Sequence, residues 1–129
     1  MITGLTILAV AGGGALGSVA RYIVTVMMNR LLPTWPAGTM VVNIIGSLAI
    51  GYLATLGIYG NRFSLEMKLL LITGFLGGFT TFSTYMFETV TALLDHRYQV
   101  AIMSFAGQLL LGSLGCLGGI MVAYALMKV

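Results

Sequence analysis

Charged side chains are scarce in this sequence. Lys and Arg together number six and Asp and Glu three among 129 residues, so that 7% of the chain is charged while 59% is hydrophobic. A soluble globular domain keeps about a quarter of its residues charged. The composition therefore excludes an ordinary soluble domain. It predicts a chain whose solvent is largely membrane lipid, with residues 1–129 forming a single transmembrane domain of a few helices.

Other shortages exclude whole classes of function. The single cysteine, Cys116, rules out an internal disulfide framework, and the few basic residues form no run that could follow a nucleic acid backbone. There is no cluster of His, Cys and carboxylates at metal-ligand spacing, and His96 stands alone. The run Gly12-Gly13-Gly14 follows no strand, so it is not a dinucleotide motif. We therefore expect neither an enzyme nor a nucleic-acid-binding protein.

Four apolar stretches are long enough to cross a bilayer. They cover about residues 5–31, 40–59, 65–94 and 98–127. Pro33 and Pro36 end the first stretch, Thr39 is the expected N-cap of the second, and Ser64 is the expected cap of the third, followed by Glu66 where a helix dipole favours negative charge. The sequence predicts an all-α integral membrane protein with four transmembrane helices.

The basic residues are almost evenly divided between the two membrane faces. Four spans put both termini on one side, together with Arg62, Lys68 and Lys128, while Arg30 and Arg97 lie on the other. Orientation follows the excess of Lys and Arg on one side, and here that excess is small. We expect insertion in both orientations and an antiparallel homodimer with its two-fold axis in the membrane plane. The alternative is that the small bias still fixes one orientation.

The segment 73–85 differs from plain membrane-spanning sequence. It gathers glycines, hydroxyls and aromatics inside the uncharged run 69–87. Because lipid offers no water to a broken backbone, such clusters at mid-membrane indicate backbone groups that face protein, ions or a wet cavity. Small residues also allow close helix crossings, and hydroxyls can bond back to the preceding turn. At this point both interpretations remain open, and Gly13 and Gly17 have the spacing of a close-packing face as well.

Two polar side chains stand within the first two spans. Asn43 carries an amide that can donate to an anion or bond a neighbouring helix. Arg21 lies about two-thirds of the way along the first span. Anchoring at the interface is the favoured interpretation for Arg21, although a positive charge near a pore mouth would also concentrate anions.

An aromatic stripe is predicted on the third span. Aromatic rings carry a positive edge, so rings interleaved with hydroxyl donors are able to line an anion path, although such stripes are usually core or lipid-facing. The stripe comprises Phe79, Phe82, Tyr85 and Met86, and the hydroxyls are those of Thr80, Thr81, Ser83 and Thr84. On the fourth span Ser104 and Gln108 share a face, whereas Ser113 falls off it, a weak signal by itself.

The segment 74–85, GFLGGFTTFSTY, resembles the third-helix signature of the Fluc family of small bacterial fluoride channels. Residues 12–22, with Arg21, and 38–46, with Asn43, are similar to that family's first and second helices in the same order. The resemblance covers nearly the whole chain.

The resemblance implies a passive, highly selective channel that exports fluoride across the bacterial inner membrane, as an antiparallel dimer with two pores. A central structural sodium ion would be held by the backbone carbonyls of Gly77 and Thr80 from both subunits, released by a helix break at 77–80. By motif position, the fluoride pathway would be formed by Asn43, Phe82, Ser83, Thr84, Tyr85 and Ser113.

Two departures from the family pattern are visible. The second aromatic position, usually phenylalanine, is Tyr85, whose hydroxyl could add a donor, hold a water or be turned away. The polar residue expected four before Ser113 is Leu109, with Gln108 one step away. The polar track on the fourth span is therefore predicted to be rearranged or shortened.

The alternative function is a small multidrug-type exporter that exchanges cations for protons. Such a transporter needs a titratable carboxylate in the membrane, and Glu88, near the end of the third span, is the available one. Replacing Glu88 should abolish an exporter and largely spare a channel. A third possibility is a non-conducting partner whose glycines pack against another membrane protein.

Overall fold

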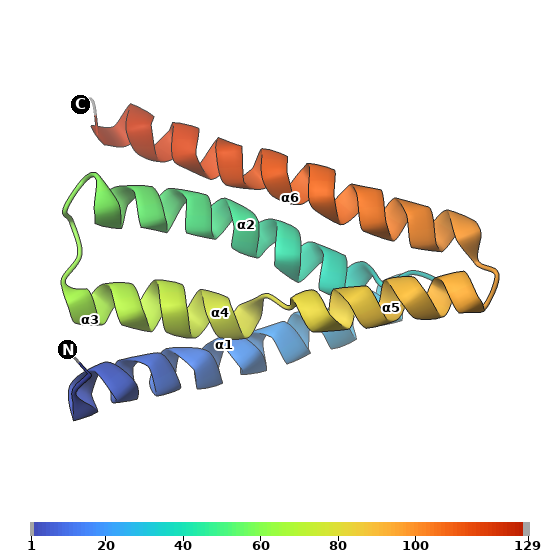
Figure 1. Ribbon diagram of the computed structural model, residues 1–129, viewed down its shortest axis with the longest axis horizontal. Coiled ribbons are helices and arrows are strands. Elements are labelled where there is room, and N and C mark those ends of the chain that lie inside the picture. The colour runs from blue at the N-terminus through green and yellow to red at the C-terminus, as the bar shows by residue number, and fades with distance from the viewer. Residues whose placement is uncertain (1, 128–129) are drawn as a thin grey trace.

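The computed structural model describes residues 2–127, and in this range the protein is helical with no strand. The start of the first span and the end of the fourth lie at one end of the bundle, beside the connection between the second and third spans (Figure 1). All four spans are long and apolar enough to cross a membrane. The helices are α1 (Gly4–Leu31), α2 (Ala37–Ile58), α3 (Leu65–Lys68), the π-helix η1 (Leu69–Leu76), α4 (Gly77–Phe79), α5 (Phe82–Leu94) and α6 (Tyr98–Met127). The predicted all-α fold with a break in the third span is confirmed.

The structure confirms one predicted helix cap and contradicts another. Ser64 caps the third span by accepting a hydrogen bond from the Met67 N–H at 3.2 Å, as predicted. Thr39 is not the cap of α2, because that helix begins at Ala37, directly after Pro36. The helix therefore starts earlier than expected, and Thr39 is carried into its buried face.

The third span changes its neighbours halfway along. Its first half, α3, η1 and α4, packs mainly along α1, whereas α5 packs mainly on α6. The second and fourth spans, α2 and α6, form the other long helix pair. Figure 1 shows the irregular link between α4 and α5 at mid-length. The break therefore joins the two helix pairs of the bundle.

Glycines bring α1 and the third span into backbone contact. Gly13 and Gly17, buried on α1, face the backbone of η1 and α4, so the predicted small-residue packing face is real. A Cβ at Gly17 would lie 2.9 Å from backbone atoms of Phe75 and Phe79. Van der Waals packing is one of the attractions that hold helices together in lipid, and the close backbone contact seen here is possible because glycine has no side chain.

We predict that Gly17→Ala lowers the free energy of unfolding by roughly 1–3 kcal/mol, the usual range for overpacking. Gly12→Ala is the matched control, since nothing lies within 4 Å of its Cβ position. The control should be unchanged or more stable by up to about 1 kcal/mol, because alanine favours the helix. Detergent unfolding followed by circular dichroism makes the comparison. Equal stability of the two variants would refute the contact.

Candidate functional site

The break consists of Thr80 and Thr81, which adopt extended backbone angles of φ −87°, ψ 159° and φ −152°, ψ 118°. The N–H and the Oγ1 of Thr80 both donate to the Leu76 carbonyl at 3.0 Å. The Thr81 side chain caps α5 by accepting from the Thr84 N–H at 3.3 Å. The predicted break at 77–80 was therefore placed too early: Gly77 and its two neighbours are helical, and the hydroxyl residues make the interruption.

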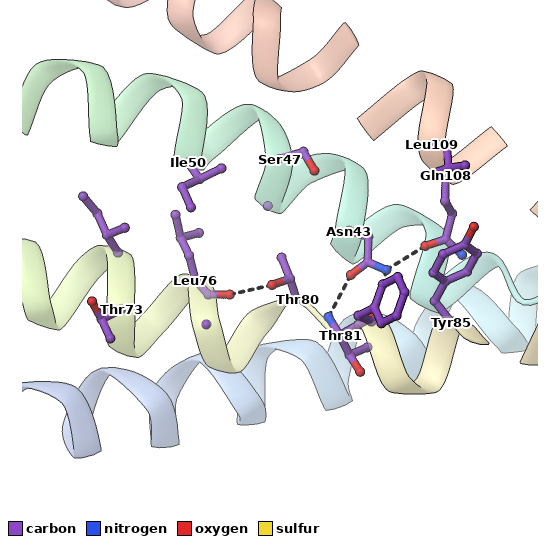
Figure 2. A pocket seen from close by; sticks show the side chains of 14 residues that line it. Asn43, Ser47, Ile50, Thr73, Leu76, Thr80, Thr81, Tyr85, Gln108 and Leu109 are labelled. Atoms are coloured by element: carbon purple, nitrogen blue, oxygen red, sulfur yellow. Dashed lines mark hydrogen bonds between the residues drawn. The ribbon is translucent and has the colours of Figure 1, made fainter. Parts of the chain in front are cut away.

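Asn43 holds the break from the neighbouring helix α2. Its Oδ1 accepts from the Thr81 N–H at 2.8 Å, and its Nδ2 donates to the Thr81 carbonyl at 3.0 Å. The side-chain amide thus pairs with both backbone groups of one residue. Figure 2 shows the bond from the Thr81 N–H. We call this pair of hydrogen bonds the Asn43 clasp. A backbone N–H can only donate, so the clasp also fixes which end of the amide is oxygen.

Gln108 of α6 completes the contact. Its Oε1 accepts from Asn43 Nδ2 at 2.6 Å, so both Asn43 N–H bonds are occupied. The Gln108 side chain is 7% exposed, and its Nε2 is buried without a hydrogen-bond partner among the described residues. The structure therefore brings α2, the break and α6 together through two side-chain amides (Figure 2).

The break also redirects backbone carbonyls. Arg21 donates from Nε to the Gly78 carbonyl at 2.9 Å, which ties α1 to the break. In an unbroken helix the Thr81 N–H would bond the Gly77 carbonyl, but it donates to Asn43 instead. Likewise the Thr84 N–H, which would bond the Thr80 carbonyl, donates to Thr81 Oγ1. The carbonyls of Gly77 and Thr80 thereby lose their helical partners.

A pocket of about 510 Å³ opens beside the Asn43 clasp. Its wall combines polar groups at the break with apolar side chains of α2 and η1, as Figure 2 shows. No acidic or basic side chain contributes to this wall. It is lined by Asn43, Gly46, Ser47, Ile50, Ile72, Thr73, Leu76, Gly77, Thr80, Thr81, Phe82, Tyr85, Gln108 and Leu109.

The two predicted aromatic positions meet edge to face in this wall. The ring centroids of Phe82 and Tyr85 are 5.8 Å apart, with an angle of 77° between the planes. Phe82 is 70% exposed, whereas Tyr85 is 4% exposed. The Tyr85 hydroxyl donates to the Phe105 carbonyl of α6 at 3.0 Å. Of the three roles left open for that hydroxyl, the structure shows the one in which it is turned away and fastens α5 to α6.

The predicted stripe is interrupted by the break. Phe79 is buried and stacks on Phe75 with centroids 5.8 Å apart, and neither Phe79 nor Met86 lines the pocket. The stripe assumed one continuous helix. The extended residues at the break change the direction in which α5 presents its side chains, so that only Phe82 and Tyr85 reach the pocket.

Other predicted residues lie elsewhere in the single chain. Ser83 and Ser113 are exposed and outside the pocket wall, and the Thr84 hydroxyl accepts from Thr81 Oγ1 at 3.0 Å. Gln108 was not predicted as a site residue, although its shared face with Ser104 was the available signal. Leu109, where the resemblance led us to expect a polar residue, is 50% exposed and lines the pocket. The polar contact of α6 with Asn43 is made by Gln108.

Glu88 lies one turn beyond Tyr85 on α5, outside the pocket. Its Oε1 accepts from the Thr39 hydroxyl at 2.8 Å, and Thr39 is 1% exposed. Glu88 Oε2 is buried without a partner among residues 2–127. The acidic group is thus held between α2 and α5, which explains why Thr39 is buried rather than at a helix end.

Comparison with known proteins identifies the family. The family described as CrcB-like protein, camphor resistance (CrcB), matches residues 8–120. The chain belongs to this CrcB-like family. A relative from Maridesulfovibrio salexigens, named fluoride-specific ion channel FluC, is 41% identical over 116 residues, covering 88% of this chain and 90% of the relative. A protein of the same name from Chlorobium luteolum is 42% identical over 119 residues, covering 92% of each chain.

These findings confirm the resemblance seen in the sequence. Relatives named as ion channels also confirm that this CrcB-like chain is not an enzyme. Together with the four spans, they make it a multi-pass membrane protein.

We predict that Asn43→Ala destabilises the CrcB-like chain by roughly 2–4 kcal/mol, because two backbone groups of Thr81 lose their partners in a medium that offers little water. Ser47→Ala is the matched control, since Ser47 lies one turn away on the same pocket wall. Unfolding in detergent and amide exchange at Thr81 measure the effect. If Thr81 stays equally protected in both variants, the Asn43 clasp does not hold the break.

Proposed function

We propose that this protein is a passive, fluoride-selective channel that exports fluoride from the bacterial cytoplasm through the inner membrane. The observation that carries the proposal is the Asn43 clasp, which holds a helix break open onto a pocket at the middle of the bundle. Broken helices at membrane depth line binding sites or water-filled cavities. Relatives that cover most of the chain are named fluoride-specific ion channels.

The electrostatics of the break favour an anion. Helix α5 begins at Phe82, so the positive end of its dipole lies at the pocket. The Arg21 guanidinium approaches the break from the α1 side, and no carboxylate lines the wall. Edge-on rings add positive edges. Fluoride is small and tightly hydrated, so amide and hydroxyl donors at close range are suited to replacing its water.

Individual residues take the following roles in the proposal. Asn43 and the rings of Phe82 and Tyr85 form the central part of the path, where they share one wall. Thr84 stands at the start of α5 beside them. Ser83 and Ser113 are exposed on the single chain, so we assign them to the path across the interface with a second copy.

The second copy is proposed to pack antiparallel, giving two pores per dimer. The pocket wall includes Phe82, a large ring that is 70% exposed on the isolated chain. Apart from Arg21, which lies within α1, the described basic residues are balanced between the two ends of the spans: Arg62 and Lys68 lie at the start of the third span, and Arg30 and Arg97 lie at the end of α1 and just before α6. This balance supports insertion in both orientations, which an antiparallel homodimer needs.

Sodium is proposed as the structural ion of this dimer. The carbonyls of Gly77 and Thr80 have lost their helical N–H partners, and nothing lies within 4 Å of the Gly77 Cβ position. Backbone carbonyls without helical partners are suited to coordinating an alkali cation. The same carbonyls of a second copy would complete the oxygen ligands around the ion. A sodium ion would supply fixed positive charge between two anion paths.

The test of function is fluoride efflux from liposomes that contain only the purified chain, recorded with a fluoride electrode and started by a potassium ionophore. We expect rapid efflux that depends on the ionophore, since a passive anion path carries charge. Chloride-loaded vesicles are the control and should release little. Efflux of both ions would overturn selectivity, and absence of fluoride efflux from folded protein would overturn the proposed function.

A separate measurement addresses the dimer and the sodium ion. We expect the purified chain to run as a dimer in detergent, and removal of sodium in favour of a bulky organic cation to slow fluoride efflux and lower the unfolding temperature. Potassium serves as the ionic-strength control. Full efflux and unchanged stability after prolonged sodium removal would exclude the sodium site while leaving the channel itself standing.

A further inference from the structure

The start of α2 lies inside the bundle rather than at its surface. Gly38 is buried, and its neighbours Ala37 and Thr39 are 7% and 1% exposed. The first N–H groups of a helix have no acceptor within that helix, and a side chain at the N-cap position usually supplies one. Here the N-cap is Pro36, whose ring carries no acceptor. The start of α2 therefore needs an acceptor from another helix.

Asn29, in the last turn of α1, supplies this acceptor. Its Oδ1 accepts a hydrogen bond from the Gly38 N–H at 3.2 Å. The glycine allows the close approach, because a Cβ at Gly38 would lie 2.6 Å from the Cα of Thr25. Thr25 is one turn before Asn29 on α1, so both contacts lie on the same face of that helix. The end of α1 thus provides the cap that Pro36 does not provide.

The start of α2 is also held from a second side. The Thr39 hydroxyl donates to Glu88 of α5 at 2.8 Å. Gly38 and Thr39 are adjacent and their partners belong to different helices, so the two hydrogen bonds together oppose rotation of α2 about its axis and sliding along it. Asn43 is four residues after Thr39 and lies on the same face of α2. The position of its amide therefore depends on how the start of α2 is held.

The Asn43 clasp tolerates little movement of α2. The hydrogen bond from Asn43 Nδ2 to the Thr81 carbonyl measures 3.0 Å, and at a separation of about 3.6 Å such a contact is no longer a hydrogen bond. A shift of α2 by little more than about half an ångström is therefore enough to break it. That shift is well below the rise of about 1.5 Å that separates neighbouring residues of a helix.

We propose that Asn29 is a positioning residue for the ion path: it caps α2 from α1 and so holds Asn43 at the height and rotation that the Asn43 clasp requires. This inference rests on the proposed fluoride channel. Asn29 lies outside the pocket wall, so it acts through α2 and not by contact with the ion. The acceptor oxygen Oδ1 is the part of its side chain that this role requires.

The experiment compares Asn29→Leu and Asn29→Asp with wild type in the liposome assay, with flux expressed per folded chain. Leucine has a similar size and removes the acceptor, whereas aspartate keeps an oxygen at the same reach. We expect Asn29→Leu to lower fluoride flux several-fold, as loss of one hydrogen bond to a buried N–H predicts. Asn29→Asp should stay within about two-fold of wild type, because Asp and Asn cap helices equally well. Met27→Leu, at a 58% exposed position of α1, is the control.

Amide exchange separates positioning from a general loss of stability. In the wild-type chain the Gly38 N–H should exchange slowly although α2 itself offers it no acceptor. In Asn29→Leu, exchange should become faster at both Gly38 and Thr81. Wild-type flux in folded Asn29→Leu, or an equal loss of flux in Asn29→Asp, would overturn the inference.

Fast exchange at Gly38 in the wild-type chain would also overturn it, and this measurement does not require any variant to fold. A wild-type chain that conducts no fluoride would instead overturn the proposed function, and slow exchange at Gly38 would still establish the cap itself.

Discussion

The hydrogen bonds between Asn43 and Thr81 are the constraint on which the rest of the site depends. A helix interrupted in lipid leaves backbone donors and acceptors that water cannot reach. Asn43 satisfies both groups of Thr81 with one side chain, at 2.8 and 3.0 Å. Arg21 satisfies the Gly78 carbonyl from the other side. The interruption is therefore a defined structure held from two neighbouring helices rather than a loosened turn.

The break also gives the bundle its organisation. The first half of the third span follows α1 through glycine contacts, and α5 follows α6, where the Tyr85 hydroxyl fastens it. The pocket forms where these two halves separate. Its position at the start of α5 places a helix N-terminus beside amide donors and ring edges, and each of these groups carries partial positive charge without a full cation in the wall.

Hydropathy and local capping signals were sufficient to predict the four spans and the role of Ser64 as the cap of the third span. The break was predicted in the correct span, over residues 77–80, whereas the structure places it at Thr80 and Thr81. In the structure Gly74 and Gly78 make close contacts with the backbone of α1, and Thr80 and Thr81 make the interruption.

The errors at the site share one physical origin. The aromatic stripe was drawn on an unbroken helix, so it included Phe79, which is buried in a ring stack. Gln108 was passed over because its role depends on the orientation of Asn43, which depends in turn on the backbone of Thr81. Sequence periodicity describes one helix at a time and carries no information about such a chain of contacts across three helices.

The Asn43 clasp also makes its two partners unequal in evolution. Thr81 is bound through its backbone, so any residue that caps α5, such as Ser or Asp, meets the demands of that position. At position 43 the side chain must carry a donor and an acceptor at the fixed distance that separates the backbone of α2 from the backbone of Thr81. Among the twenty amino acids only asparagine does so at this length. Substitution is thus tolerated at position 81 and not at position 43.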